Sequence, residues 1–165
     1  MASTIPFNGQ PQDKPNKKAP MLDAYFEKEG LNFFQKREVP GPDHTVVHLT
    51  ALPTGKHRLM AAIITDNSVY TVIRCELGKR TPRMGDASFW EYLRRTNAAH
   101  AFFKYAVNGD GTLFLDVCLP AADDHFDPAM VRTAMNLIVF HLQDTYEDVL
   151  KWLDAPGDAG TGMHV

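Results

Sequence analysis

The chain has 165 residues, and 44% of them are hydrophobic, so it is long enough to bury the core of one domain. Charged residues make up 22%, which is ordinary for a globular protein, and the formal net charge of -3 provides no global field that would draw the chain to nucleic acid or to a membrane. No apolar run could span a bilayer, and the N-terminus lacks the apolar core of a signal peptide. We therefore expect one soluble, cytoplasmic domain.

Both ends of the chain have the composition of tails. Prolines interrupt a polar, lysine-bearing stretch over residues 1–19, and the residues from Ala155 onward are rich in glycine. We expect a disordered N-terminal tail over 1–19, a single domain over 20–154 and a flexible C-terminal tail over 155–165.

The first ordered elements are a helix and a group of strands. The helix is predicted over Pro20–Glu29, where Leu22, Tyr25 and Phe26 share one face and Gly30 provides the stop. Turn residues then separate four runs that are typical of strands: FFQKREV, TVVHLTAL, HRLMAAIIT and VYTVIRCEL. Alternation within these runs gives one apolar and one mixed face, which predicts an antiparallel sheet with helices packed mainly on one side.

A second helix is predicted over Ser88–Asn97. Ser88 and Glu91 have the spacing of a capping box, in which each side chain bonds the other residue's backbone N–H. The apolar side chains of this helix, including Phe89 and Trp90, span a wider arc than packing on one sheet requires. The excess indicates a second contact surface.

The C-terminal part contains a hairpin and a long helix. The turn Asn108–Gly111 between two alternating runs is the strongest local signal in the sequence. The helix is predicted over Asp127–Leu153, with Asp127 as its cap. Its middle is apolar on nearly all sides, with Val139 and Phe140 off the main stripe, so it needs a second element or a second subunit to pack against. The predicted fold class is α+β, in the order α-β-β-β-α-β-β-α, and the pattern is also compatible with a short extra strand near Phe33.

Neither a catalytic centre nor a cofactor site is predicted. Cys75 and Cys118 lie in apolar, strand-like runs and are expected to be two buried thiols in a reducing compartment. The sequence has no G-x-S-x-G nucleophile motif and no phosphate-binding glycine loop. Asp123–His125 could pair a carboxylate with an imidazole, but a loop before a helix cap needs no such chemistry.

Seven histidines raise the hypothesis of a metal site. His44 and His48 are four residues apart in a predicted strand, so they would lie about 13 Å apart and could not share one ion. His57 could approach His48 across a turn, which gives two ligands at most. We therefore expect no metal site.

Charge is distributed unevenly along the chain. Residues 77–104 hold six bases and two acids, whereas residues 123–158 hold eight acids and two bases. Three of these acids lie late in the last predicted helix: Asp144, Glu147 and Asp148. They form either a solvated face or a surface for a basic partner, such as a nucleic-acid-binding protein. The basic region 79–95 supports the alternative that the chain binds nucleic acid directly.

Three stretches carry a resemblance to a known family: LDAYFEKEGLNF, VYTVIRCEL and FWEYLRRTNAAHAFFKYAVNGDGTLFLDVCLP. In the longest of them a helix ends at Asn97, and a polar strand entry, a hairpin and a strand closing in Leu-Pro follow. Over roughly residues 21–153 the chain resembles the YbjN family and, through it, the type III secretion chaperone-like fold. The resemblance implies a bacterial α+β protein, usually a homodimer, that holds protein partners and has no known catalytic centre. Nothing in the sequence indicates a role in secretion.

We therefore expect a non-catalytic, chaperone-like or adaptor module that forms a homodimer and binds an unidentified protein partner without a cofactor. Five residues are expected at the dimer or partner interface: Phe89, Trp90, Leu93, Val139 and Phe140. For Trp90 an interface position and a core position are equally compatible with the pattern.

Overall fold

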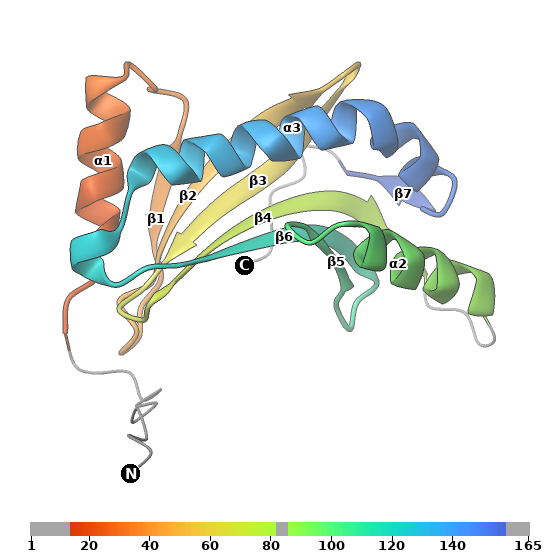
Figure 1. Cartoon of the computed structure of the whole chain (residues 1–165), viewed down its shortest axis with the longest axis horizontal. Coiled ribbons are helices and arrows are strands. Elements are labelled where there is room, and N and C mark those ends of the chain that lie inside the picture. The colour runs from red at the N-terminus through yellow and green to blue at the C-terminus, as the bar shows by residue number, and fades with distance from the viewer. Residues whose placement is uncertain (1–13, 82–85, 158–165) are drawn as a thin grey trace, which may run out of the picture.

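The computed structural model describes residues 14–81 and 86–157, and it arranges them as one sheet with helices (Figure 1). The elements in chain order are α1 (Lys18–Lys28), β1 (Gln35–Glu38), β2 (Val46–Thr54), β3 (His57–Thr65), β4 (Tyr70–Lys79), α2 (Ala87–Ala99), β5 (Lys104–Val107), β6 (Thr112–Pro120), the 3-10 helix η1 (Asp123–His125), α3 (Pro128–Leu150) and β7 (Ala155–Pro156). The predictions for residues 1–13 and 158–165 lie outside the described residues.

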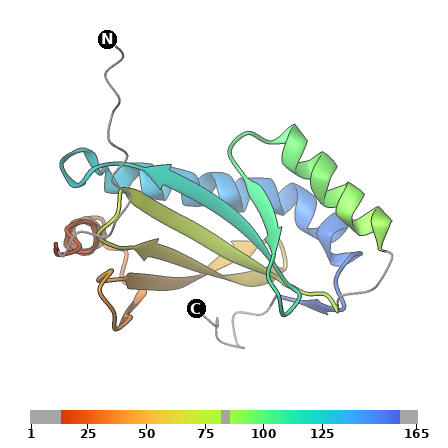
Figure 2. The same ribbon diagram turned by 90° about the horizontal axis from the view of Figure 1, so that it is seen from below.

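The sheet is antiparallel, with the strand order β1-β2-β3-β4-β6-β5, and β7 pairs with β4 beside this path. Helix α3 crosses one face of the sheet, α1 stands at the β1–β2 end, and α2 lies at the opposite end near β5 (Figures 1 and 2). The predicted α+β class, with helices mainly on one face, is confirmed. The optional extra strand near Phe33 is present as β1.

The core lies between α3 and the sheet. Ile138 and Leu142 of α3 are buried against inward-facing residues of the central strands, among them Ile63, Ile73 and Leu115. Each of these strand residues is flanked by neighbours that point to the other face, because side chains alternate along a strand. The apolar face that the 3.6-residue period gives α3 therefore packs on the apolar face that the two-residue period gives the strands, and together they form one layer.

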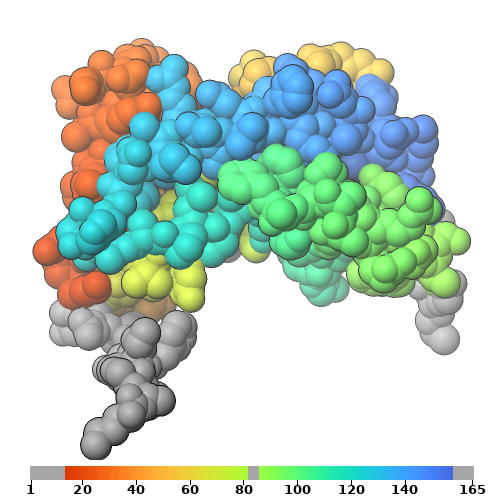
Figure 3. Space-filling view, in the orientation of Figure 1, coloured from red at the N-terminus to blue at the C-terminus, as the bar shows by residue number. Residues whose placement is uncertain are grey.

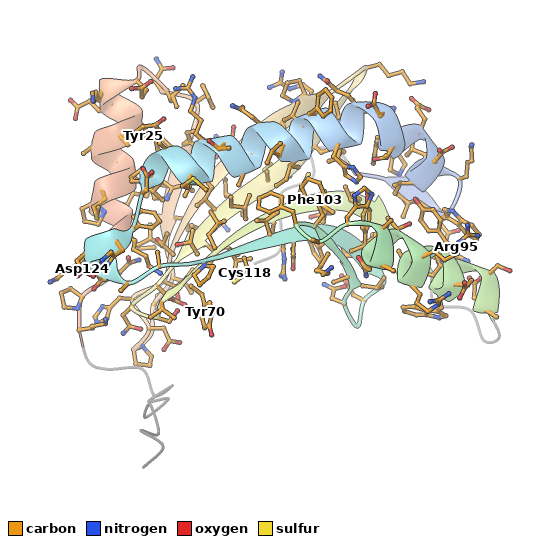
Figure 4. All side chains as sticks on the ribbon, in the orientation of Figure 1. Tyr25, Tyr70, Arg95, Phe103, Cys118 and Asp124 are labelled. Atoms are coloured by element: carbon orange, nitrogen blue, oxygen red, sulfur yellow. The ribbon has the colours of Figure 1, made fainter. Side chains whose placement is uncertain are left out.

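The face of the sheet away from α3 is mixed, as its alternation predicts. Val47, Leu49 and Ala62 form a small apolar cluster there. Arg74 makes two hydrogen bonds to Asp116, at 2.9 and 2.7 Å. Of the two cysteines, Cys75 is buried and Cys118 is exposed, so the prediction of two buried thiols is wrong for Cys118. Figure 4 shows Cys118 on the side of β6 away from α3.

Helix α1 begins before the predicted domain boundary. The structure places Lys18 in the first turn of the helix and buries its side chain, although a tail was predicted over 1–19. The Lys18 ammonium donates to the carbonyl oxygens of Ser68, at 2.9 Å, and Tyr70, and it lies 3.8 Å from Asp66. Lys18 thereby ties α1 to the β3–β4 turn, and burial lowers its pKa.

Two local predictions about the C-terminal half are confirmed. Strands β5 and β6 form the expected hairpin, and the Thr112 amide donates to Asn108 Oδ1 at 3.0 Å in its turn. Asp127 caps α3 by accepting a 2.9 Å bond from the Ala129 amide. Helix α3 ends at Leu150, however, and not at the predicted Leu153.

The segment after α3 folds back onto the sheet, although a tail was predicted from Ala155. Ala155 and Pro156 pair with β4 as β7, and the buried Gly157 amide donates to the Leu77 carbonyl at 2.9 Å. The hydroxyl of buried Tyr146 also donates to Leu77 O, at 2.8 Å. The ordered chain therefore extends at least to Gly157.

Within the described part of the chain, no helix is both long enough and apolar enough to cross a membrane.

Candidate protein interface

Helix α2 packs through a narrow inner face and exposes the rest. Phe89 and Leu93 are buried, whereas Trp90 is 56% exposed and Glu91, Arg94 and the other outward residues are also exposed. The predicted capping box does not form, because the residue before the helix is Asp86, the helix begins at Ala87 and Glu91 pairs with Arg94 instead. The wide apolar arc is thus divided between a core contact and a solvent-facing tryptophan.

An arginine and a tryptophan from distant parts of the chain hold the inner face of α2. The Arg80 guanidinium lies 4.4 Å from the centre of the Phe89 ring and forms an ion pair with Asp86. Trp152, just after α3, stacks on Tyr92 with ring centres 5.2 Å apart. Arg80 also donates to the Trp152 carbonyl, so the three segments form one unit. This anchoring fixes the direction in which Trp90 points.

The end of α2 is joined to β5 by one side chain. Asn97 donates to the Tyr105 carbonyl at 3.0 Å and accepts from the Tyr105 amide at 2.7 Å. The amide group of Asn97 therefore satisfies both backbone groups of one residue of β5, as a neighbouring strand would. The sequence predicted that the helix ends at Asn97, whereas α2 continues to Ala99, and the structure adds this contact.

The outer side of α3 also carries exposed apolar groups. Phe140 is 68% exposed, Met130 and Leu137 are exposed, and Val139 is half-buried. Figure 3 shows that α2 and α3 lie beside each other on one side of the molecule. Of the five residues predicted at an interface, Trp90 and Phe140 are therefore the most available, Val139 is partly available, and Phe89 and Leu93 contribute to the core.

The predicted acidic surface is partly neutralised within the chain. Glu147 lies 3.1 Å from the Lys56 ammonium and 3.2 Å from Nε2 of His57, and hydrogen bonds from these two groups lower the pKa of Glu147. Asp148 pairs with Lys151. Asp144 is exposed.

Three of the five bases of region 79–95 make ion pairs within the chain, and Arg95 is exposed. Lys79 lies 3.4 Å from Asp110, Arg80 pairs with Asp86, and Arg94 pairs with Glu91 at 2.7 Å. Arg83 lies outside the described residues.

His48 and His57, the histidines that the sequence suggested could approach each other, lie apart. In the register of β2 and β3, His48 lies opposite Ile63 and His57 lies opposite Thr54, so the two imidazoles are not neighbours. Among residues 14–81 and 86–157, no group of three or more His, Cys, Asp or Glu side chains is placed to hold a metal ion.

One histidine contact was not predicted from the sequence. Nε2 of buried His48 lies 2.8 Å from Asp23, whose other oxygen accepts a 2.7 Å bond from Lys36. Burial acts to raise the pKa of Asp23, but the hydrogen bonds from Lys36 and His48 outweigh it and lower that pKa. The Phe26 ring packs edge-on to the His48 ring, so this carboxylate–imidazole pair fastens α1 to the sheet.

A cavity of about 410 Å³ lies at the same end of the molecule, between the segment leading into α1 and the β1–β2 loop. Its lining is mainly proline and polar residues: Pro15, Asn16, Ala19, Pro20, Lys36, Glu38, Val39, Pro40, Gly41, His44, Thr45 and Val46. Helix α1, which contributes to the lining of this cavity, and α2 lie at opposite ends of the sheet (Figure 1).

A second group of rings joins the α2–β5 connection to α3. His141 stacks on Phe103, with ring centres 4.6 Å apart, and the His100 ring lies 4.6 Å from it on another side. Figure 4 shows Phe103 beneath α3. The Tyr105 hydroxyl lies 2.8 Å from Nε2 of His141, and burial raises the pKa of Tyr105, so this hydroxyl stays protonated and can donate to neutral His141.

Protonation of His141 is expected to weaken the fold. Burial and the nearby His100 lower the pKa of His141, and Asp144 opposes this only partly. The pKa of His141 is lower in the folded protein than its unfolded value of about 6.5, so neutral His141 favours the folded state. This contribution to the free energy of unfolding is fully present above about pH 6.5 and is lost as the pH falls through the folded pKa. We expect His141→Gln to lose less stability than the wild type between about pH 7 and pH 5 in urea unfolding. An unchanged pH profile for His141→Gln would refute this assignment.

Comparison with known proteins finds no family model and no curated protein sequence that matches this chain.

Proposed function

We propose that this protein is a non-catalytic, chaperone-like or adaptor module that acts as a homodimer and binds a protein partner. The observation that carries the proposal is the exposure of two large aromatic side chains, Trp90 and Phe140, on helices that share one side of the molecule. Large aromatics supply much of the binding energy of protein interfaces.

The charge arrangement supports a protein partner more than nucleic acid. Phosphate binding depends on bases that are free to approach the backbone of the nucleic acid. Lys79, Arg80 and Arg94 instead already make ion pairs within the chain. Of the acids late in α3, Glu147 and Asp148 are likewise paired within the chain, so the attraction for a basic partner rests on Asp144 and would act mainly on the rate of association.

The proposal predicts that association depends on the two exposed aromatics. Light scattering at micromolar concentration should give a mass near twice the 18.5 kDa of one chain. Proteins that cross-link to the wild type in its native extract should be recovered much less with Trp90→Ala or Phe140→Ala. The matched control is Phe33→Ala, because Phe33 is as exposed as Trp90 but lies between α1 and β1.

Two outcomes would contradict the proposal. A mass near 18.5 kDa at all concentrations tested would refute the homodimer. Equal recovery of partners by Trp90→Ala, Phe140→Ala and Phe33→Ala would show that the exposed aromatics do not form a partner surface.

A further inference from the structure

Strand β6 has a neighbour along its whole length on one side but along only half of it on the other. Strand β4 pairs with β6 from Thr112 to Pro120. Strand β5 begins at Lys104, opposite Asp116, so no described strand lies beside residues 117–120 on that side. Figure 2 shows that β5 accompanies only one end of β6. We refer to the unpaired side of residues 117–120 as the free edge of β6.

Cys118 presents its backbone N–H and C=O at this free edge. The two backbone groups of Tyr105 point away from β6, since both are bound by the Asn97 side chain. The groups of the next residue, Lys104, therefore point toward its partner Asp116. The two-residue period of a strand gives Cys118 the same direction as Asp116, and no backbone hydrogen bond to a described loop residue satisfies its groups. Such an edge is a template for one more extended segment.

The flank of α3 beside the free edge is apolar and exposed. His141 marks the flank that faces β5, because its Nε2 lies 2.8 Å from the Tyr105 hydroxyl. At about 100° per residue, Leu137 and Met130 lie within about 40° of His141 around the helix axis. Leu137 is 44% exposed and Met130 is 52% exposed. Both precede His141 in the helix, which places them toward the end of α3 that lies beside the free edge and away from β5 (Figure 1).

The first described residue lies at one end of this edge. Lys14 Nζ is 3.5 Å from Asp123 in η1, three positions after β6 ends at Pro120. Residues 1–13 therefore join the described chain at the C-terminal end of β6. Phe7 is seven positions before Lys14, a stretch that spans up to about 23 Å, whereas the free edge is about 13 Å long. The preceding segment is thus long enough to reach back along the whole free edge.

We propose that residues 4–8 of this chain lie along the free edge of β6 as an additional strand. The strand runs parallel to β6, because it leads toward Lys14 at the C-terminal end of β6. Its two large apolar side chains, Ile5 and Phe7, are two positions apart, so they share one face and pack against the exposed flank of α3. The inference goes beyond the proposed function and depends neither on a dimer nor on a partner protein.

The proline of the segment fixes the register. In a parallel pair, a residue that faces the other strand donates to the residue before its opposite neighbour and accepts from the residue after it. With Pro6 opposite Cys118, the Cys118 amide donates to the Ile5 carbonyl. The Phe7 amide then donates to the Cys118 carbonyl. Pro6 has no N–H on its outer side, where none is needed, as prolines at sheet edges require. Cys118 faces away from α3 (Figure 4), so Ile5 and Phe7 face toward it.

A second copy of the chain fits the free edge less well. A two-fold axis would pair β6 with β6 antiparallel. With Cys118 opposite Cys118, Pro120 of the second copy would come beside Asp116, where Lys104 already lies. A pair centred on Leu119 would instead place Pro120, which has no N–H, opposite Cys118.

Hydrogen exchange at the Cys118 amide tests the proposal in the full chain. This N–H lies outside the β4 ladder, so coverage by residues 4–8 should slow its exchange at least about tenfold relative to an open amide. Phe7→Asp places a carboxylate against the apolar flank of α3 and should restore fast exchange. Gln12→Asp adds the same charge outside the proposed strand and should exchange like the wild type. NMR resolves the single amide.

A disulfide trap tests the register. Pro6→Cys should form a disulfide with Cys118 when oxidised glutathione is the oxidant, since opposite residues of neighbouring strands bring their Cα atoms into the range that a disulfide spans. Cys75 is fully buried and does not compete. Gln12→Cys is the control and should cross-link at least about tenfold more slowly, although it is nearer to Lys14 in the sequence. Mass spectrometry of the digested protein identifies the linked peptides.

Three outcomes would overturn the proposal. Fast exchange of the Cys118 amide in the wild type would show that the free edge is open. Slow exchange that Phe7→Asp leaves unchanged would assign the edge to another occupant, and to a second copy if the slowing grows with protein concentration. Equal rates of cross-linking for Pro6→Cys and Gln12→Cys would show that residues 4–8 have no fixed place beside β6.

Discussion

Gly78→Ala is expected to lower the free energy of unfolding by about 3 kcal/mol or more, because the site combines a disfavoured backbone conformation with a contact that leaves no room for a methyl group. Gly78 has a φ of +140° at the irregularity where β4 shifts its register against β6. A Cβ there would lie 2.4 Å from the Ala155 carbonyl oxygen and 2.8 Å from the Gly157 amide nitrogen. Both opposing atoms belong to the backbone, so neither can rotate away.

The substitution should act first on the segment that follows α3. The Asp154 amide donates to the Lys79 carbonyl at 2.9 Å, and the Gly157 amide donates to Leu77 beside the Tyr146 hydroxyl. Displacement of β7 would break these bonds and uncover Tyr146, so amide hydrogens over 154–157 should exchange much faster in the variant.

Urea unfolding together with hydrogen exchange measures both effects. Gly109→Ala is the control, since no atom lies within 4 Å of a Cβ built at Gly109, and it should change stability by no more than about 0.5 kcal/mol. A Gly78→Ala variant as stable as the Gly109→Ala variant would mean that β7 does not pack on β4 as described.

Phe89→Ala should destabilise the fold by about 3–5 kcal/mol, whereas Trp90→Ala should cost about 0.5 kcal/mol. The two aromatics are adjacent in α2, but Phe89 is 2% exposed and Trp90 is 56% exposed. Loss of the Phe89 ring leaves a cavity against Trp152 and removes the surface on which the Arg80 guanidinium lies. Loss of the Trp90 indole removes mainly solvent-facing area.

The comparison is best made by denaturant unfolding at several protein concentrations, so that a contribution of self-association to the measured stability is detected. Trp90→Ala should also weaken partner binding, since Trp90 is one of the two exposed aromatics of the proposed partner surface. Equal destabilisation by the two substitutions would place Trp90 in the core and remove the main support for an interface on α2.

The features that sequence analysis predicted well are those specified by neighbouring residues. The turn at Asn108–Gly111 and the cap at Asp127 depend on bonds between residues a few positions apart, and both are confirmed. The order of helices and strands follows from periodicity, which is also local.

The errors arise where distant segments decide the outcome. Ser88 could not be excluded as a cap from the sequence, because Asp86 is held in place by Arg80 and the anchoring residue Trp152 comes much later in the chain. Lys18 is typical of a tail in its local context, and only the carbonyls of the β3–β4 turn make its burial possible. The alternation through Asp116 could have placed Cys118 on the outer face, since residues two apart in a strand share a side.

The bond pattern of Asn97 limits how copies of this protein can join. Backbone groups at the rim of a sheet readily recruit further strands, which leads to open-ended fibres. At Tyr105 both groups are already bound to the Asn97 side chain, so β5 offers no template there. Association at this end of the molecule is thereby left to helix surfaces, which can close on themselves as a pair and stop growing.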